Sequence, residues 1–187
     1  MIEPELVRSL KDWAQLLGLL IGVPVAAVGL FKALYEIRAN REQRAAELLW
    51  KRVNTAKELL DDIHHHELAK SAVHMLDWRE SQADYGLTSN QIETISYSDV
   101  LSALGKQLAE CHAKDIYIRD CFDWFFYRVD RIEHYIRRKL IEFEDVESVF
   151  KVYAQHIARD AQIYHGFLDF HGYDLARQFF MRYTPAS

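Results

Sequence analysis

Residues 14–31, which read AQLLGLLIGVPVAAVGLF, form an apolar stretch without any charged side chain. Ten of its eighteen residues are Leu, Ile, Val or Phe, and Gln15 is its one polar side chain. A helix of this length extends about 27 Å, close to the hydrocarbon thickness of a bilayer, which is about 30 Å. Trp13 and Tyr35 stand where aromatic side chains anchor a span at the membrane surface. The sequence therefore predicts a transmembrane helix over 14–35.

Two other interpretations of this stretch are a cleaved signal peptide and a buried or interfacial helix. A signal peptide begins with a basic segment, whereas residues 1–13 carry two basic and three acidic side chains. Val25-Ala26-Ala27 is only a weak cleavage site. A core helix this apolar is typical of a domain larger than a 187-residue chain provides. The membrane span is favoured over both.

The flanks of the span predict its orientation. Residues 32–54 carry six basic and three acidic side chains, and basic residues near a span favour the cytoplasmic side. We therefore expect a short extracytoplasmic N-terminus over 1–13 and a cytoplasmic domain over 36–187, at the inner (plasma) membrane. Each basic side chain beside anionic lipid contributes about 1 kcal/mol to membrane binding. The basic residues expected at this membrane surface are Lys32, Arg38, Arg41 and Arg44.

The composition of the cytoplasmic part argues against nucleic-acid binding. Residues 55–187 carry fifteen basic and twenty-two acidic side chains, whereas nonspecific binding depends on neutralising phosphates. We expect no DNA partner. The two cysteines, Cys111 and Cys121, do not form a disulfide framework, in keeping with a reducing compartment.

Helical periodicity predicts an all-α fold, with a single N-terminal transmembrane helix followed by a cytoplasmic bundle of about four or five helices. Apolar residues recur at spacings of three and four in three stretches, 49–63, 118–140 and 146–168. No alternating stretch predicts a strand, and 80–97 is interpreted as a loop.

The ends of the other helices are predicted from capping signals. A weaker helix is expected over 98–114, with Ser98 as its N-cap, and a short last helix over 174–182. The sequence allows two end points for the first helix. It continues from the membrane to about Trp78, or it breaks near Asn54, which a capping box follows.

The span carries small residues on one face. Gly18, Gly22 and Ala26 lie at i, i+4 and i+8, a spacing that lets two helix backbones approach closely in lipid. Small residues are common in spans without any such role, and Pro24 favours a kink. Self-association through this face is a hypothesis.

Acidic residues and histidines recur four residues apart, as in Asp61/His65 and Asp62/His66. Such a pair on a helix can chelate a transition metal, but two ligands do not make a tight site. The same spacing recurs at Asp130/His134, His156/Asp160 and His165/Asp169. Charge pairs on an acidic surface explain it more simply, so no metal and no cofactor are expected.

One spacing of Arg and His raises an enzymatic alternative. The segment from Arg159 to His165 resembles the Arg and His pattern of the HEPN ribonucleases, and Arg128 to His134 does so more loosely. A His there would act as general base while an Arg stabilises the phosphorane. A chain with this many Arg and His residues also produces such spacings by chance. Phosphate-binding loops, the GxSxG motif and CxxC are absent from the sequence.

Two segments carry a family resemblance: EIRANREQRAAELLWKRV, which follows the span, and IRDCFDWFFYRVDRIEHYIRRKLIEFEDVESVFKVYAQHI. With the span they make the chain resemble an uncharacterised family of short bacterial membrane proteins. The resemblance implies bacterial origin, one N-terminal span and a helical cytoplasmic domain. It implies no activity.

The sequence favours a non-enzymatic, membrane-anchored interaction or regulatory module at the cytoplasmic face of the membrane. It is expected to self-associate and to bind a protein or small-ligand partner. Trp124 and Tyr127, in an aromatic run, are the candidate interface residues. The alternative is a signal-activated effector, which acts by membrane disruption through clustered spans or as a ribonuclease using Arg159 and His165.

Overall fold

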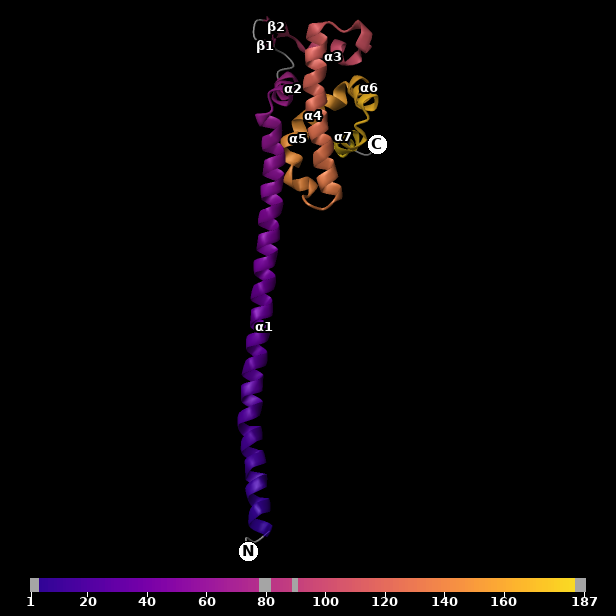
Figure 1. Ribbon diagram of the computed structural model, residues 1–187. Coiled ribbons are helices and arrows are strands. Elements are labelled where there is room, and N and C mark those ends of the chain that lie inside the picture. The colour runs from indigo at the N-terminus through magenta and orange to yellow at the C-terminus, as the bar shows by residue number, and fades with distance from the viewer. Residues whose placement is uncertain (1–3, 78–81, 89–90, 184–187) are drawn as a thin grey trace. The chain divides into compact units, whose positions relative to one another are not determined.

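The computed structural model describes residues 4–77, 82–88 and 91–183 (Figure 1). The side chains left outside this description within those ranges are those of residues 4–12, 14–17, 19, 21–24, 26–28, 88 and 91. The chain divides into two compact units, Met1–Trp50 and Lys51–Ser187. Each unit is described by itself.

The first unit is formed by helix α1, Pro4–His65, which continues into the second unit. Proline suits a first helical position because it has no N–H to leave unbonded. Among the described residues, no helix joins the length and the apolar content that a membrane crossing requires. The predicted transmembrane helix over 14–35 thus has no support from the structure. Many of its side chains lie outside the described residues, and the span stays a prediction.

The second unit is a helical bundle, which confirms the all-α prediction. Helix α4 is central to it and contacts α2, α3 and α7 (Figure 1). The elements that follow α1 are α2 (Glu67–Asp77), β1 (Ala83–Thr88), β2 (Gln91–Ile95), α3 (Tyr97–Gly105), the 3₁₀ turn Leu108–Glu110, α4 (Ala113–Arg137), the 3₁₀ turn Phe143–Asp145, α5 (Glu147–Arg159), α6 (Ala161–His171) and α7 (Asp174–Met181).

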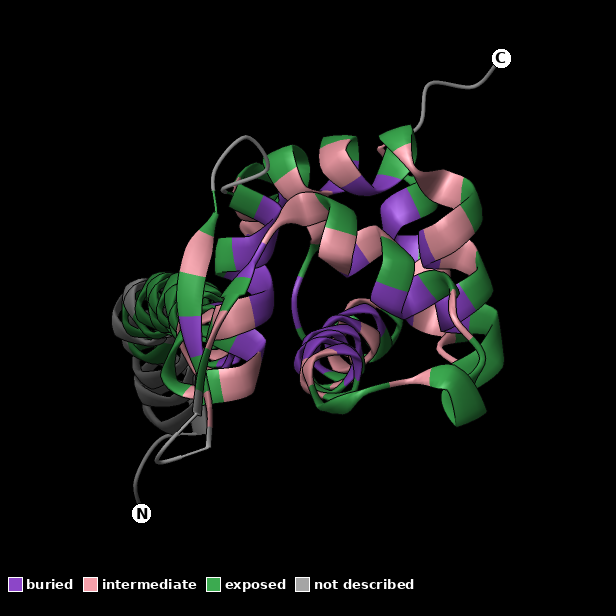
Figure 2. Ribbon diagram, turned by 90° about the horizontal axis from the view of Figure 1, so that it is seen from above, coloured by how far each residue is buried: buried purple, intermediate pink, exposed green. Residues whose placement is uncertain are grey.

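The apolar stripe of α4 forms the centre of the core. Each buried large apolar side chain contributes about 1.5–3 kcal/mol. Figure 2 shows the buried segments gathered where the helices face one another. The stripe residues without exposed surface are Ile118, Phe122, Phe125, Val129 and Ile132. The predicted stripe ends early, because α4 stops at Arg137 and Leu140 is exposed.

The third predicted stripe, 146–168, covers two helices. Helices α5 and α6 meet at Asp160, whose φ of −116° and ψ of 37° are not helical. The Asp160 carboxylate accepts a hydrogen bond from the Tyr97 hydroxyl at 2.9 Å. Phe150 and Ile157 before the break and Tyr164 and Leu168 after it are all buried. The apolar periodicity therefore continues across the turn at Asp160, and so it could not reveal that the helix breaks there.

The expectation that the chain has no strands was wrong. Strands β1 and β2 pair antiparallel within 83–95, in the segment interpreted as a loop. Tyr85 and Ile95 point into the core, and the Thr94 hydroxyl donates to Asp84 at 2.7 Å. The two strands are too short to show a clear alternation, and packing on the bundle stabilises them.

Several helices begin or end at residues other than the predicted ones. Ser96, not Ser98, caps α3, and its hydroxyl and the Asp99 carboxylate form a capping box. Helix α3 ends at Gly105, so the helix predicted over 98–114 was wrong in its second half. Helix α1 ends at His65, neither near Asn54 nor at Trp78. The last helix was predicted correctly to within one residue.

Among the described residues, four side chains of the Asp, Glu, Lys and Arg type are buried, and all four lie on α4. Glu133, 1% exposed, accepts hydrogen bonds from Arg137 at 3.2 Å and from Arg182 at 2.7 Å. Arg128 donates to the Asp62 backbone carbonyl at 3.2 Å. The complete set is Asp115, Arg119, Arg128 and Glu133. Because buried charges need partners, each one fixes α4 against a neighbour.

Asp130 of α4 caps helix α7, which gives a test of the packing. One of its carboxylate oxygens accepts the backbone N–H groups of Leu175 at 3.0 Å and Ala176 at 3.1 Å. Asp130→Ala leaves both donors unpaired and is expected to lower the free energy of unfolding by about 1–2 kcal/mol. Asp130→Asn keeps an acceptor oxygen and should lose less. Urea unfolding of the full chain measures both, and equal losses would contradict the capping role.

Candidate functional site

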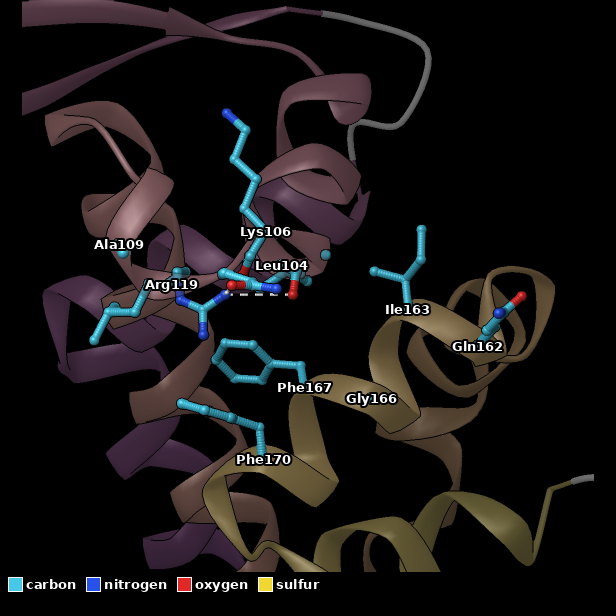
Figure 3. A pocket seen from close by; sticks show the side chains of 12 residues that line it. Leu104, Lys106, Ala109, Arg119, Gln162, Ile163, Gly166, Phe167 and Phe170 are labelled. Carbon is cyan, nitrogen blue, oxygen red and sulfur yellow. Dashed lines mark hydrogen bonds between the residues drawn. The ribbon is translucent and has the colours of Figure 1, made fainter.

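A pocket of about 780 Å³ opens where α3 ends beside α4 and α6 (Figure 3). Pockets of this volume hold small organic molecules. Its lining residues are Leu104, Gly105, Lys106, Gln107, Leu108, Ala109, Arg119, Gln162, Ile163, Gly166, Phe167 and Phe170. The pocket has mostly apolar walls and one buried charge.

That charge belongs to Arg119, which is 6% exposed. Its Nη1 donates to the carbonyl oxygens of Ala103 at 3.0 Å, Leu104 at 3.3 Å and Lys106 at 3.2 Å. Carbonyls at a helix C-terminus lack helical partners and carry partial negative charge. Arg119 therefore joins α4 to the end of α3.

Within the part of the chain that the structure describes, no carboxylate contacts Arg119 directly, although the neighbouring Asp120 interacts with it electrostatically. The other cation of the pocket wall, Lys106, lies 2.9 Å from both carboxylate oxygens of Asp115. A buried charge without an opposite charge is costly. Carbonyl dipoles and aromatic rings offset part of this cost.

The aromatic rings come from α6. The Arg119 Cζ lies 5.0 Å from the centre of the Phe167 ring and 5.6 Å from that of Phe170, within cation–π range. Figure 3 shows Phe167 pointing toward the guanidinium. Phe167 is buried, whereas Phe170 is 67% exposed. The ring of Phe170 is thus available to a ligand.

Gly166 leaves room in the same wall. It lies on α6 between the pocket residues Ile163 and Phe167, and a Cβ atom added to it would meet no atom within 4 Å. A side chain at this position would extend into open space. The volume of the pocket can therefore be changed without disturbing the core.

His171 stands beside this site, at the end of α6. Its ring lies 4.3 Å from that of Phe167, and its Nδ1 lies 3.1 Å from an oxygen of Asp123. The Tyr173 hydroxyl donates to the same oxygen at 2.7 Å. Burial lowers the pKa of His171 and outweighs the opposing effect of Asp123; Arg119 lowers the pKa further. His171 is therefore mainly neutral at pH 7.

The two residues of the ribonuclease alternative lie on consecutive helices. Arg159 is exposed in the last turn of α5, and His165 is half-buried on α6 after the break at Asp160. Burial and the nearby Arg177 lower the pKa of His165. Neither residue lines the pocket. Within the described chain, no hydrogen bond or ion pair joins them.

The candidate interface residues, Trp124 and Tyr127, are 40% and 45% exposed. Their rings meet edge to face with centres 6.0 Å apart. Trp124 also contacts the His66 ring at 4.5 Å and the Arg128 guanidinium at 5.2 Å. About half of this aromatic surface is thus used within the chain.

The pairs considered for metal binding have other partners. The His65 ring lies 2.7 Å from the Asp61 backbone carbonyl, and Asp62 pairs with Arg128 and Arg131. The described residues contain no group of three or more His, Cys, Asp or Glu side chains arranged to hold a metal ion.

The remaining predicted residues lie on α1. The four basic residues Lys32, Arg38, Arg41 and Arg44 are exposed. Gly18 is exposed too, whereas Gly22 and Ala26 are outside the residues whose exposure is described. The small-residue face stays a prediction.

Sequence reasoning missed Arg119, Phe167 and Phe170. Arg119 follows the stripe residue Ile118 and so stands at the edge of the apolar face, where long basic side chains usually extend to solvent. Arg119 is buried because α3 ends beside it at Gly105, whereas the sequence predicted a helix that continues to residue 114.

Comparisons with known proteins assign neither a family nor a function to the chain. The sequence matches no family model and no curated protein, and the fold matches no solved structure. The family resemblance therefore stays a prediction.

The burial of His171 gives a testable pH dependence. Its pKa in the folded chain lies below the ordinary value of 6.5, so the unfolded chain takes up the proton first as the pH falls. The corresponding stability is present above pH 6.5 and is lost as the pH falls through the folded-state pKa. His171→Gln should therefore flatten the fall in melting temperature between about pH 7 and about pH 5. An unchanged slope would contradict this role.

Proposed function

We propose that this chain is a membrane-anchored, non-enzymatic binding module whose helical domain holds a small ligand in the pocket around Arg119. The observation that carries the proposal is a buried guanidinium that no described carboxylate contacts directly, at the wall of a pocket of about 780 Å³. A ligand with complementary chemistry would offset the cost of burying that charge.

The chemistry of the pocket favours binding over catalysis. Acyl or phosphoryl transfer and hydrolysis need a nucleophile, or an acid and a base, in contact with the substrate. The described pocket lining offers amide, amine, guanidinium and apolar groups, and none of its side chains is Asp, Glu, His, Cys, Ser or Tyr. Its one possible nucleophile, the Lys106 amine, is ion-paired with Asp115. These groups can hold and orient a ligand.

The proposed anchor is residues 14–35, and the exposed basic residues lie at its C-terminal end, Lys32, and just after it, Arg38, Arg41 and Arg44. Their placement supports an orientation with 36–187 at the cytoplasmic face of the inner membrane of a bacterium. Self-association through Gly18, Gly22 and Ala26 is part of the same proposal, since small residues at this spacing allow close helix packing in lipid.

A charge in the proposed span tests the anchor. Arginine near the middle of a membrane helix costs about 2.5–3.5 kcal/mol per residue. The double variant Leu20→Arg/Val25→Arg should leave the membrane fraction after a carbonate wash, whereas the wild-type chain stays in it. The matched control is Leu20→Ala/Val25→Ala, which should also stay. An arginine variant that stays membrane-bound would contradict the anchor.

A filled pocket tests the binding function. Gly166→Trp places an indole in the pocket, while Gly166→Ala leaves the pocket open and stabilises α6 by up to about 1 kcal/mol. In a thermal-shift screen of the detergent-solubilised full chain, small molecules should stabilise the wild-type and Gly166→Ala chains. The same molecules should have no effect on Gly166→Trp. Equal shifts in all three chains would place the ligand elsewhere.

A further inference from the structure

We infer that the ligand of this pocket carries one carboxylate, which pairs with the guanidinium of Arg119, and a flat apolar body that lies against Phe170. The inference rests on the proposed binding function and specifies the class of ligand. It is argued from the open nitrogens of Arg119, from the charge balance of the pocket and from its exposed ring.

Two nitrogens of the Arg119 guanidinium have no hydrogen-bond partner among the described residues. Its Nη1 serves the three carbonyls of the α3 terminus. Its Nε and Nη2 form no hydrogen bond within the described chain, and neither is among the atoms sealed from solvent without a partner. Arg119 lines the pocket, and these two nitrogens are the part of its guanidinium that no described residue occupies (Figure 3). They present two parallel N–H groups, the geometry that binds a carboxylate through both of its oxygens.

The charge of the pocket matches a single negative charge. Lys106 is ion-paired with Asp115, so Arg119 is the one cation among the described lining side chains that no carboxylate contacts directly; Asp120 interacts with it only electrostatically. A carboxylate neutralises that charge. A phosphate brings nearly two negative charges, which the partly negative C-terminus of α3 would repel more strongly than the single charge of a carboxylate. The helix N-terminus that commonly assists phosphate binding is not part of this contact.

The walls select the rest of the ligand. Phe170 and Leu108 line the pocket with 67% and 62% of their surfaces exposed. Covering these side chains removes apolar surface from water, and an aromatic body can stack on the Phe170 ring. The pocket is large enough for a body of more than one ring.

A purely structural role for Arg119 makes a different prediction. If the guanidinium only caps α3, the pocket should not distinguish an acid from its neutral amide. The two roles separate in binding measurements with probes of equal shape.

The experiment uses fluorine NMR titrations of the detergent-solubilised full chain. The probes are 4-fluorobenzoate, 4-fluorobenzamide and 4-fluorophenyl phosphate, at matched ionic strength. The acid should bind about ten to one hundred times more tightly than the amide, the range expected for a hydrogen-bonded charge pair. The phosphate should bind no more tightly than the acid.

Variants locate the effect. Arg119→Gln retains N–H donors for the α3 carbonyls and should remove the preference for the acid, with folding checked by circular dichroism. Should this variant fail to fold, Phe170→Ala and Gly166→Trp keep Arg119 in place. Phe170→Ala should weaken the acid and the amide by similar factors, and Gly166→Trp should abolish the binding of both.

The outcomes separate this inference from the proposed function. Equal binding of acid and amide, or tighter binding of the phosphate, overturns the inference and leaves a ligand pocket. Binding of the acid that persists unchanged in Gly166→Trp overturns it as well. If no probe binds but the thermal-shift screen yields molecules blocked by Gly166→Trp, the ligand class is wrong and the function stands. If neither experiment finds a ligand, both are wrong.

Discussion

Burial of the aromatic face of α4 is the constraint on which the bundle depends. Phe122, Phe125 and Phe126 lie within one turn and a half of this helix, and none of them has exposed surface. Side chains three and four residues apart share a face, whereas Phe125 and Phe126 point about 100° apart. One neighbouring helix cannot cover so wide an apolar surface. Helices α2, α3 and α7 therefore contact α4 from different directions.

The polar side chains of α4 then fix each neighbour in place. Arg119 reaches the end of α3, Arg128 reaches Asp62 of α1, and Asp130 caps α7. Such contacts are more directional than apolar packing, so they determine where along α4 each neighbour sits. The pocket follows from this arrangement. Arg119 holds the terminus of α3 beside α6, and α6 presents Gly166 where a side chain would have filled the gap.

Features repeated along the sequence could be predicted, and features made by single contacts could not. The apolar stripe from Ile118 to Ile132 gave the core face of α4, because every turn of the helix repeats the signal. The hairpin over 83–95 and the break at Asp160 each depend on a few contacts with distant residues. A position such as Asp160 has the same local pattern whether a helix continues or ends.

The candidate site shows the same limit more sharply. The spacing of Arg159 and His165 resembles a catalytic motif, yet neither residue lines the pocket. Arg119 belongs to no recognisable sequence motif. Its place in the pocket wall follows from the position of the α3 terminus relative to α4. Spacing in a sequence identifies sites built within one element, whereas this pocket is assembled from α3, the 3₁₀ turn that follows it, α4 and α6.

The identity of the buried cation helps to decide what the pocket is for. The three carbonyls at the end of α3 require only one nitrogen of Arg119, and a lysine amine, with three donors, could serve all of them. What arginine adds is a rigid planar fork whose other nitrogens remain fixed when the first is occupied. A fork held this way at the wall of a pocket, with one ring buried behind it and another exposed beside it, is preorganised to bind a planar oxyanion. The structural contacts of Arg119 and its proposed contact with a ligand therefore support each other, because the carbonyls of α3 fix the direction in which the open nitrogens point.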